Sequence, residues 1–263
     1  MLCLFLASQY PSNGILEDPT SFIFQQCSIE KFDDPDGEYI KARSTLLQRL
    51  LFQSSQSKFN RTSITIGDRS IDSVSGLFQC RGDLDDHKCN ECMKAVQNVS
   101  SGLCGNSMAA RIQLSGCHVQ YEADGYENPT PADHEVHHKI CGEPQAIVAS
   151  ELFEEVRSKA FEALEAEVGD EGVHLGFYEI KHEGVHAMVQ CDVGIGECEC
   201  AKCVADAVHV VEEECHGSSW GQVFLGLCYL GYEFHPHEVH GGPVVPIHPG
   251  MNMCLICRTM HVS

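Results

Sequence analysis

Hydrophobic residues recur at helical spacing in two long segments of the chain, 39–51 and 151–168. The apolar stripes are made of Ile40, Leu46, Leu47, Leu50 and Leu51 in the first segment and Phe153, Val156, Ala160, Leu164 and Val168 in the second. A shorter helical pattern follows each of them, at about 88–99 and 200–213. Both halves of the chain therefore predict a long helix followed by a short one.

Strand-like runs lie around these helices, at 21–27, 63–66 and 76–80, and a strand pair closes each half at 109–122 and 221–233. The alternation of apolar residues changes parity inside each closing pair. This change predicts a bulge or bend near 115–116 and 226–227. Strands interleaved with two helices and local hairpins indicate an α+β fold, in which an antiparallel sheet carries helices on one face.

The cysteines show that the two halves are copies of one unit. Five of them recur 111 residues later with the spacing C-x8-C-x2-C-x11-C-x12-C: Cys80, Cys89, Cys92, Cys104 and Cys117, then Cys191, Cys200, Cys203, Cys215 and Cys228. One further cysteine precedes each block, Cys27 in the first copy and Cys141 in the second. Six cysteines close three disulfides in each copy, and the sequence alone permits fifteen pairings of them.

The 263 residues accommodate two domains of ordinary size. We expect the domains at 20–125 and 139–238, an acidic, histidine-rich linker at 126–138 and an irregular tail at 239–263. Sixteen cysteines are well above ordinary usage and are typical of a secreted protein with disulfides. The sequence thus indicates an oxidising compartment.

The net charge of -21 is concentrated in the second half of the chain. Residues 141–240 contain 20 acidic and 4 basic side chains, against 18 and 12 in residues 1–140. Such a surface repels phosphate backbones and anionic lipids, so we expect no nucleic-acid partner.

The first cysteine block lies in the sequence LFQCRGDLDDHKCNECMKAV, which is followed by AARIQLSGCHVQYE. This constellation resembles the plant ginkbilobin-type domain, also called the salt-stress-response/antifungal domain. The resemblance covers about residues 20–238. Two copies without a kinase are similar to the cysteine-rich repeat secretory proteins and the plasmodesmata-located proteins. The family fold, two helices on a five-stranded antiparallel sheet, agrees with the element order above.

The resemblance also implies which cysteines pair. The pairs would be Cys27–Cys104, Cys80–Cys89 and Cys92–Cys117 in the first domain, and Cys141–Cys215, Cys191–Cys200 and Cys203–Cys228 in the second. Four cysteines are left over: Cys3, Cys198, Cys254 and Cys257. Cys254 and Cys257 could pair with each other or with Cys3 or Cys198, or could belong to an aberrant tail.

A sugar site is implied at three polar positions, because the ginkgo lectin of this family binds mannose there. In the first copy these positions are Ser28, Arg111 and Glu122, with Ser28 in place of an asparagine. Arginine and carboxylate groups can each form paired hydrogen bonds to neighbouring hydroxyls. In the second copy only the glutamate matches, since the positions are Gly142, Gln222 and Glu233. The alternative is a surface ion pair between Arg111 and Glu122.

Fifteen histidines offer a second candidate chemistry. The segments HEVHHK (134–139) and HPHEVHGG (235–242) could ligate a transition metal, together with the thiolates of Cys254 and Cys257. A zinc site needs four converging ligands, and scattered histidines do not define one. We therefore interpret these histidines as solvated linker residues and expect no metal and no cofactor.

Two N-glycosylation sequons begin at Asn60, which we expect in an exposed loop, and at Asn98, near a helix end. Residues 1–7 resemble the end of a signal sequence but are too short for one, so we expect the native N-terminus upstream. No stretch has the 18 or so apolar residues of a membrane span, including the final residues.

No phosphate-binding loop, nucleophile elbow or HExxH motif is present, and we expect no enzyme activity. The resemblance implies a secreted recognition module in the apoplast or at plasmodesmata, acting in cell-to-cell communication or defence. Its partner would be a cell-wall or microbial glycan or another extracellular protein domain, and homo- or hetero-oligomers are compatible with this role. The alternatives are an antifungal mannose-binding lectin and a metal-binding secreted protein.

Overall fold

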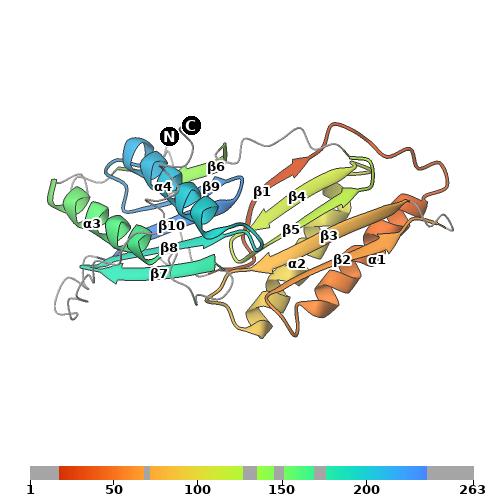
Figure 1. Cartoon of the computed structure of the whole chain (residues 1–263), viewed down its shortest axis with the longest axis horizontal. Coiled ribbons are helices and arrows are strands. Elements are labelled where there is room, and N and C mark those ends of the chain that lie inside the picture. The colour runs from red at the N-terminus through yellow and green to blue at the C-terminus, as the bar shows by residue number, and fades with distance from the viewer. Residues whose placement is uncertain (1–17, 68–71, 127–134, 145–150, 169–175, 236–263) are drawn as a thin grey trace, which may run out of the picture.

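The computed structural model describes residues 18–67, 72–126, 135–144, 151–168 and 176–235, which form two domains that lie side by side (Figure 1). The first domain consists of β1 (Phe22–Cys27), α1 (Glu38–Gln53), β2 (Phe59–Thr65), β3 (Ser73–Cys80), α2 (Asp86–Leu103), β4 (Ala109–Leu114) and β5 (Cys117–Ala123). Its strands form an antiparallel sheet in the order β1-β4-β5-β3-β2.

The second domain repeats this topology. It consists of β6 (Val136–Cys141), α3 (Glu151–Glu167), β7 (Phe177–His182), β8 (Val185–Cys191), α4 (Glu197–Glu214), β9 (Trp220–Leu225) and β10 (Cys228–Phe234). The sheet order β6-β9-β10-β8-β7 matches that of the first domain strand for strand. The predicted α+β fold of two tandem domains, each with a five-stranded antiparallel sheet and two helices, is confirmed.

Each domain has its own core between one sheet face and its two helices (Figure 1). In the first domain, the stripe of α1 buries Leu46 and Leu50 completely against the sheet. Ile112 and Leu114 of β4 face the helices, because alternate residues of a strand point to the same side. Arg111 and Gln113, which alternate with them, therefore point to the opposite face of the sheet.

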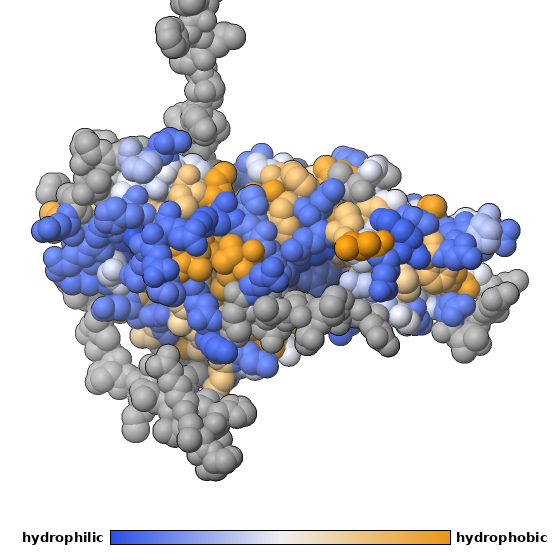
Figure 2. Space-filling model, turned by 90° about the horizontal axis from the view of Figure 1, so that it is seen from above, coloured by the Kyte–Doolittle hydropathy of each residue, from blue (hydrophilic) through white to orange (hydrophobic). Residues whose placement is uncertain are grey.

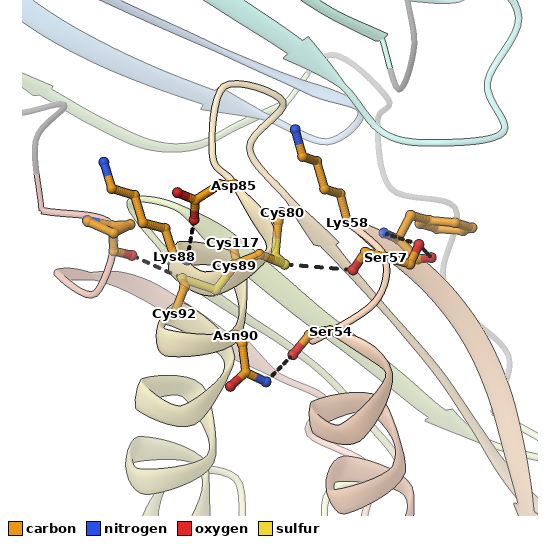
Figure 3. The surroundings of a disulfide bond; sticks show 12 residues. Ser54, Ser57, Lys58, Cys80, Asp85, Lys88, Cys89, Asn90, Cys92 and Cys117 are labelled. Carbon is orange, nitrogen blue, oxygen red and sulfur yellow. Dashed lines mark hydrogen bonds between the residues drawn. A yellow bond between two sulfur atoms is a disulfide. The ribbon is translucent and has the colours of Figure 1, made fainter.

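Asp85 ends the loop before α2 and caps that helix, since its carboxylate accepts a hydrogen bond from the backbone N–H of Lys88 at 2.7 Å. Asn90, one turn further on, donates to Ser54 Oγ at 3.0 Å and so ties α2 to the end of α1 (Figure 3). The helix runs from 86 to 103, longer than the predicted 88–99, and therefore includes Asn98.

Six disulfides close the two domains in the described residues, three in each, and none of the six joins one domain to the other. They are Cys27–Cys104, Cys80–Cys89, Cys92–Cys117, Cys141–Cys215, Cys191–Cys200 and Cys203–Cys228, the same pairs that the family resemblance implies. Figure 3 shows how Cys89 and Cys92 at the start of α2 reach Cys80 and Cys117 on two adjacent strands. The bonds therefore fix each helix to its sheet.

An arginine is buried in each core at equivalent positions of α1 and α3. Arg157 is only 1% exposed, and it donates to Cys215 O at 3.0 Å and to the Tyr232 hydroxyl at 3.1 Å. In the first domain, Arg43 likewise contacts Gly105 O and the Tyr121 hydroxyl. The two arginines are 114 residues apart, as are Cys27 and Cys141. This shared offset is the feature of the sequence that marks the arginines as equivalent.

The second domain begins earlier than the sequence indicates. Strand β6 starts at Val136, so residues 136–138 are not part of the linker expected at 126–138. His137 and His138 are half-buried rather than solvated, and burial lowers the pKa of both. The reason is tertiary: His138 stacks on Phe24 of the first domain, with ring centroids 5.7 Å apart.

Two smaller expectations about strands have different outcomes. The change of alternation in each closing strand pair falls on the bends at 115–116 and 226–227, which join β4 to β5 and β9 to β10. Asn60, however, lies within β2 opposite Phe78 and is half-buried, not in an exposed loop. Pairing of β2 with β3 extends the strand beyond the run that local alternation marks.

Candidate functional site

The face of the first sheet that points away from the helices carries polar side chains that are nevertheless buried. Gln79 is 2% exposed, Gln113 3% and His118 6%. These residues lie at one end of adjacent strands, and the second domain covers them. We therefore take the buried polar surface between the two domains as the candidate functional site.

Two glutamines link the domains by reciprocal hydrogen bonds. Gln79 Nε2 donates to Cys191 O at 2.9 Å, and Gln190 Nε2 donates to Cys80 O at 3.1 Å. The oxygen of each side chain accepts a backbone N–H, from Val193 for Gln79 at 3.0 Å and from Gly82 for Gln190 at 3.1 Å. Each amide thus uses both its donor and its acceptor across the interface.

Arg111 forms an ion pair across the same interface. Its guanidinium lies 3.1 Å from the carboxylate of Asp192 and also donates to Gly226 O at 3.2 Å. The side chains of Arg111 and Asp192 are only 11% and 22% exposed, so solvent screens the pair poorly. The arginine that the family resemblance assigns to a sugar is thereby held by the second domain.

His118 lies beside this ion pair, with Nε2 at 3.8 Å from a carboxylate oxygen of Asp192. Burial, together with the positive charge of Arg111, lowers the pKa of His118 to about 3 against the opposing effect of Asp192. The imidazole is therefore neutral at physiological pH.

A small cavity remains between the domains and is bounded by Arg111, Ser115, His118 and Asp192, among others. Its volume is about 10 Å³, which is enough for about one water molecule. Pockets that bind small organic ligands have volumes of roughly 300–1,000 Å³. This cavity cannot hold a monosaccharide.

Ser28, Arg111 and Glu122 lie on the same face of the first sheet, as a shared site requires. Ser28 and Glu122 flank Ala109: the Ser28 hydroxyl accepts the N–H of Ala109 at 3.0 Å, and Glu122 is opposite Ala109 in the strand register. Glu122 is exposed. Arg111, however, contacts Asp192, so the alternative of an ion pair with Glu122 is wrong.

The equivalent positions in the second domain form no such group. Gly142 leaves room for the indole of Trp220, which a Cβ at that position would approach to 2.5 Å. Gln222 is buried. Glu233 lies 3.6 Å from Nδ1 of His186 and 3.0 Å from Nε2 of His235. Although burial raises the pKa of Glu233, its contacts with the two histidines lower it below the ordinary value overall.

Several other predicted features lie partly or wholly outside the described residues. These include Cys3, Cys254, Cys257 and residues 236–242 of the second histidine-rich segment. Cys198 is half-buried on α4, outside the six disulfides. Within the described ranges, no three histidine, cysteine or carboxylate side chains are arranged to hold a metal ion. None of the helices there has the length and apolar content needed to span a membrane.

Comparison with known proteins agrees with the repeated architecture. Residues 26–124 and 140–235 match the salt stress response/antifungal family. The chain belongs to this family. Plasmodesmata-located protein 2 of Arabidopsis thaliana is 36% identical over 220 residues, which are 84% of this chain and 68% of the relative. Plasmodesmata-located protein 4 of the same plant is 37% identical over 250 residues, a match that covers 84% of this chain and 76% of the relative.

A solved structure of the salt stress response/antifungal family has the same tandem fold. The crystal structure of the tandem DUF26 ectodomain of a cysteine-rich receptor-like protein from Arabidopsis thaliana superposes with a TM-score of 0.68 at 27% identity. The match covers 82% of this chain and 98% of that one. The tandem arrangement of the two domains is therefore shared with this solved structure.

Sequence reasoning missed most of the interface, including Gln79, Gln190 and Asp192. Gln79 and Gln190 share the 111-residue offset of the cysteines, and each directly precedes a cysteine of the repeat. A repeated polar residue on the outer face of a strand was therefore the available signal. Asp192 had none, because Arg81 occupies its equivalent position in the first copy.

Proposed function

We propose that the chain is a non-enzymatic extracellular recognition module that acts at the plant cell surface or at plasmodesmata in cell-to-cell communication or defence. The proposal rests on the tandem fold, which is shared with the ectodomain of a receptor-like protein, and on the three disulfides in each domain of this chain. Disulfides of this number persist in oxidising compartments. The plasmodesmata-located relatives support the same cellular site.

The surface supports recognition of another extracellular domain. Several large apolar side chains are exposed, among them Ile29 at 96%, Leu152 at 70% and Phe52 at 69%. Figure 2 shows separate hydrophobic patches within a mainly hydrophilic face. Separate patches with polar surroundings are typical of contacts that form and dissociate rather than of a permanent interface.

Localisation tests this proposal directly. A fluorescent fusion extended with the upstream genomic sequence should appear in the apoplast or in puncta at plasmodesmata. A diffuse cytosolic signal would refute it. Non-reducing peptide mapping of the same protein should recover the six disulfides, whereas free thiols at those twelve cysteines would contradict an oxidising compartment.

The antifungal lectin is the second candidate, and the contact of Arg111 with Asp192 speaks against it. We expect the protein to bind no mannoside on a glycan array. Glu122→Ala provides the matched variant, because Glu122 is exposed and outside the domain interface. Mannoside binding that Glu122→Ala abolishes would replace the proposed function with that of a lectin.

A further inference from the structure

The contacts between the domains follow an internal two-fold symmetry. Residues 111 positions apart exchange roles: Gln79 binds Cys191 O, and Gln190 binds Cys80 O. On the first strands, where the offset is 114, Phe24 stacks on its own counterpart His138. Contacts of this kind are isologous, like those between the identical subunits of a symmetric dimer. By geometry alone, either domain could pair with a copy of itself.

The charged residues break this symmetry. Arg111 of the first domain lies opposite Asp192 of the second at 3.1 Å. The counterpart of Asp192 in the first domain is Arg81, which instead forms a two-point ion pair with Asp83 at 2.6 and 3.0 Å. The counterpart of Arg111 in the second domain is Gln222, which carries no charge.

A pair of identical domains therefore cannot form the ion pair between Arg111 and Asp192, and the charged residue that it contains has no partner of opposite charge. Two first domains in this arrangement would place Arg111 of each opposite Arg81 of the other. Two second domains would place Asp192 of each opposite Gln222. Both arrangements bury a charged group without an opposite charge beside it. Burying such an unpaired charge costs much more free energy than burying an ion pair. Only one domain of each kind satisfies both charges.

We propose that the outer sheet face of the first domain, which carries Gln79 and Arg111, is a heterotypic recognition surface. It binds the second domain of the same chain or of another copy, and it does not bind the first domain of another copy. Arg111 and Asp192 determine that specificity, while the glutamine exchange supplies contacts that either kind of pair could form. The interface holds the domains together without help from the covalent connection.

The test uses the full, oxidised chain with a protease site inserted between residues 126 and 135 and cleaved after folding. None of the six disulfides in the described residues crosses this point, so within that part of the chain only the interface joins the halves. Native mass spectrometry should detect one first domain bound to one second domain. After mixing with an isotopically labelled cleaved sample, exchanged pairs should again contain one domain of each kind. Halves that separate on cleavage, or pairs of identical domains, would overturn the proposal.

Charge variants of the cleaved protein assign the specificity. Asp192→Arg should weaken association by about 100-fold or more, since it opposes Arg111 with a like charge. Arg111→Asp combined with Asp192→Arg should restore association to within about ten-fold of wild type, because the pair is re-formed in reverse. Glu197→Arg makes the same charge change at an exposed position of α4 and should have no effect.

A folding defect can be separated from a specificity defect by two measurements. Trp220 fluorescence reports whether the second half of the cleaved protein is folded, and far-ultraviolet circular dichroism reports this for each half. Arg111→Gln, which copies Gln222 of the second domain, should also weaken association without adding repulsion. Association unchanged in folded Asp192→Arg, or a double variant no tighter than the single ones, would refute the assignment.

Discussion

The buried arginine of the second domain offers a direct test of how the core is stabilised. Replacing Arg157 by alanine removes hydrogen bonds to Cys215 O and the Tyr232 hydroxyl and an ion pair with Glu154. It also removes a guanidinium that lies 5.4 Å from the centre of the Tyr232 ring. The side chain is 2% exposed, so water cannot replace these contacts in the folded state.

The expected loss is large but below the maximum for a buried charge. Breaking a buried ion pair costs about 3–5 kcal/mol when the remaining charge has no other partner. Glu154 does keep partners, because it accepts the N–H of Gly217 at 2.9 Å and lies 3.2 Å from Nδ1 of His216. We therefore expect Arg157→Ala to lower the free energy of unfolding by about 3 kcal/mol.

Trp220 makes the measurement specific to this domain, because it is the single tryptophan of the chain and lies on β9. Guanidinium unfolding followed by its fluorescence should show a lower midpoint for Arg157→Ala with the slope unchanged. Lys159→Ala is the matched control on the same helix, since Lys159 pairs with Glu155 on an exposed face and should leave the midpoint unmoved. Equal midpoints for Arg157→Ala and wild type would refute the reasoning.

Three further predictions concern acid sensitivity, packing between the domains and the disulfides. The pKa of His118 is lowered from 6.5 to about 3, so the unfolded chain takes up a proton first and stability is lost as pH falls through that window. His118→Gln should flatten this part of the stability–pH curve, and an unchanged curve would assign the acid sensitivity elsewhere. Gly82→Val should separate the domains of the cleaved protein, because a Cβ there would lie 2.4 Å from Cβ of Phe177. Gly102→Ala, whose Cβ meets nothing within 4 Å, is its control, and equal association of both variants with wild type would contradict the packing argument. Removing Cys27–Cys104, with a sequence separation of 77, should destabilise the first domain by about 4.5 kcal/mol by loop entropy. Removing Cys80–Cys89, with a separation of 9, should cost about 2.6 kcal/mol. If thermal unfolding shows that loss of Cys80–Cys89 destabilises the domain more than loss of Cys27–Cys104, loop entropy is not the cause.

The elements of each domain could be predicted because their signals are local. The stripe of Leu46 and Leu50 predicts a helix whose buried side is known before the sheet is placed. The alternation around Ile112 and Leu114 similarly predicts which residues of β4 face the core. The repeat then doubles each prediction, since the same pattern 111 residues later must fold in the same way.

The role of a polar residue on the outer sheet face could not be predicted in this way. Arg111 has the alternation and polarity of a solvent-exposed strand residue, and the family resemblance assigned it to a sugar. Its partner Asp192 is 81 positions away in the sequence, in another domain. His137 and His138 have the composition of a linker, yet pairing with β9 makes them part of a strand, and His138 stacks on Phe24 of the first domain.

The sequence by itself determined the two-domain repeat, the order of helices and strands and the cysteines that close each copy. These properties depend on periodicity and spacing within about one hundred residues. Only the tertiary structure decided that Arg111, Gln79 and His118 lie between the domains rather than in solvent. The physical reason is that burial of a polar side chain depends on which distant surface covers it, and a linear pattern of polar residues is the same whether water or a second domain lies opposite.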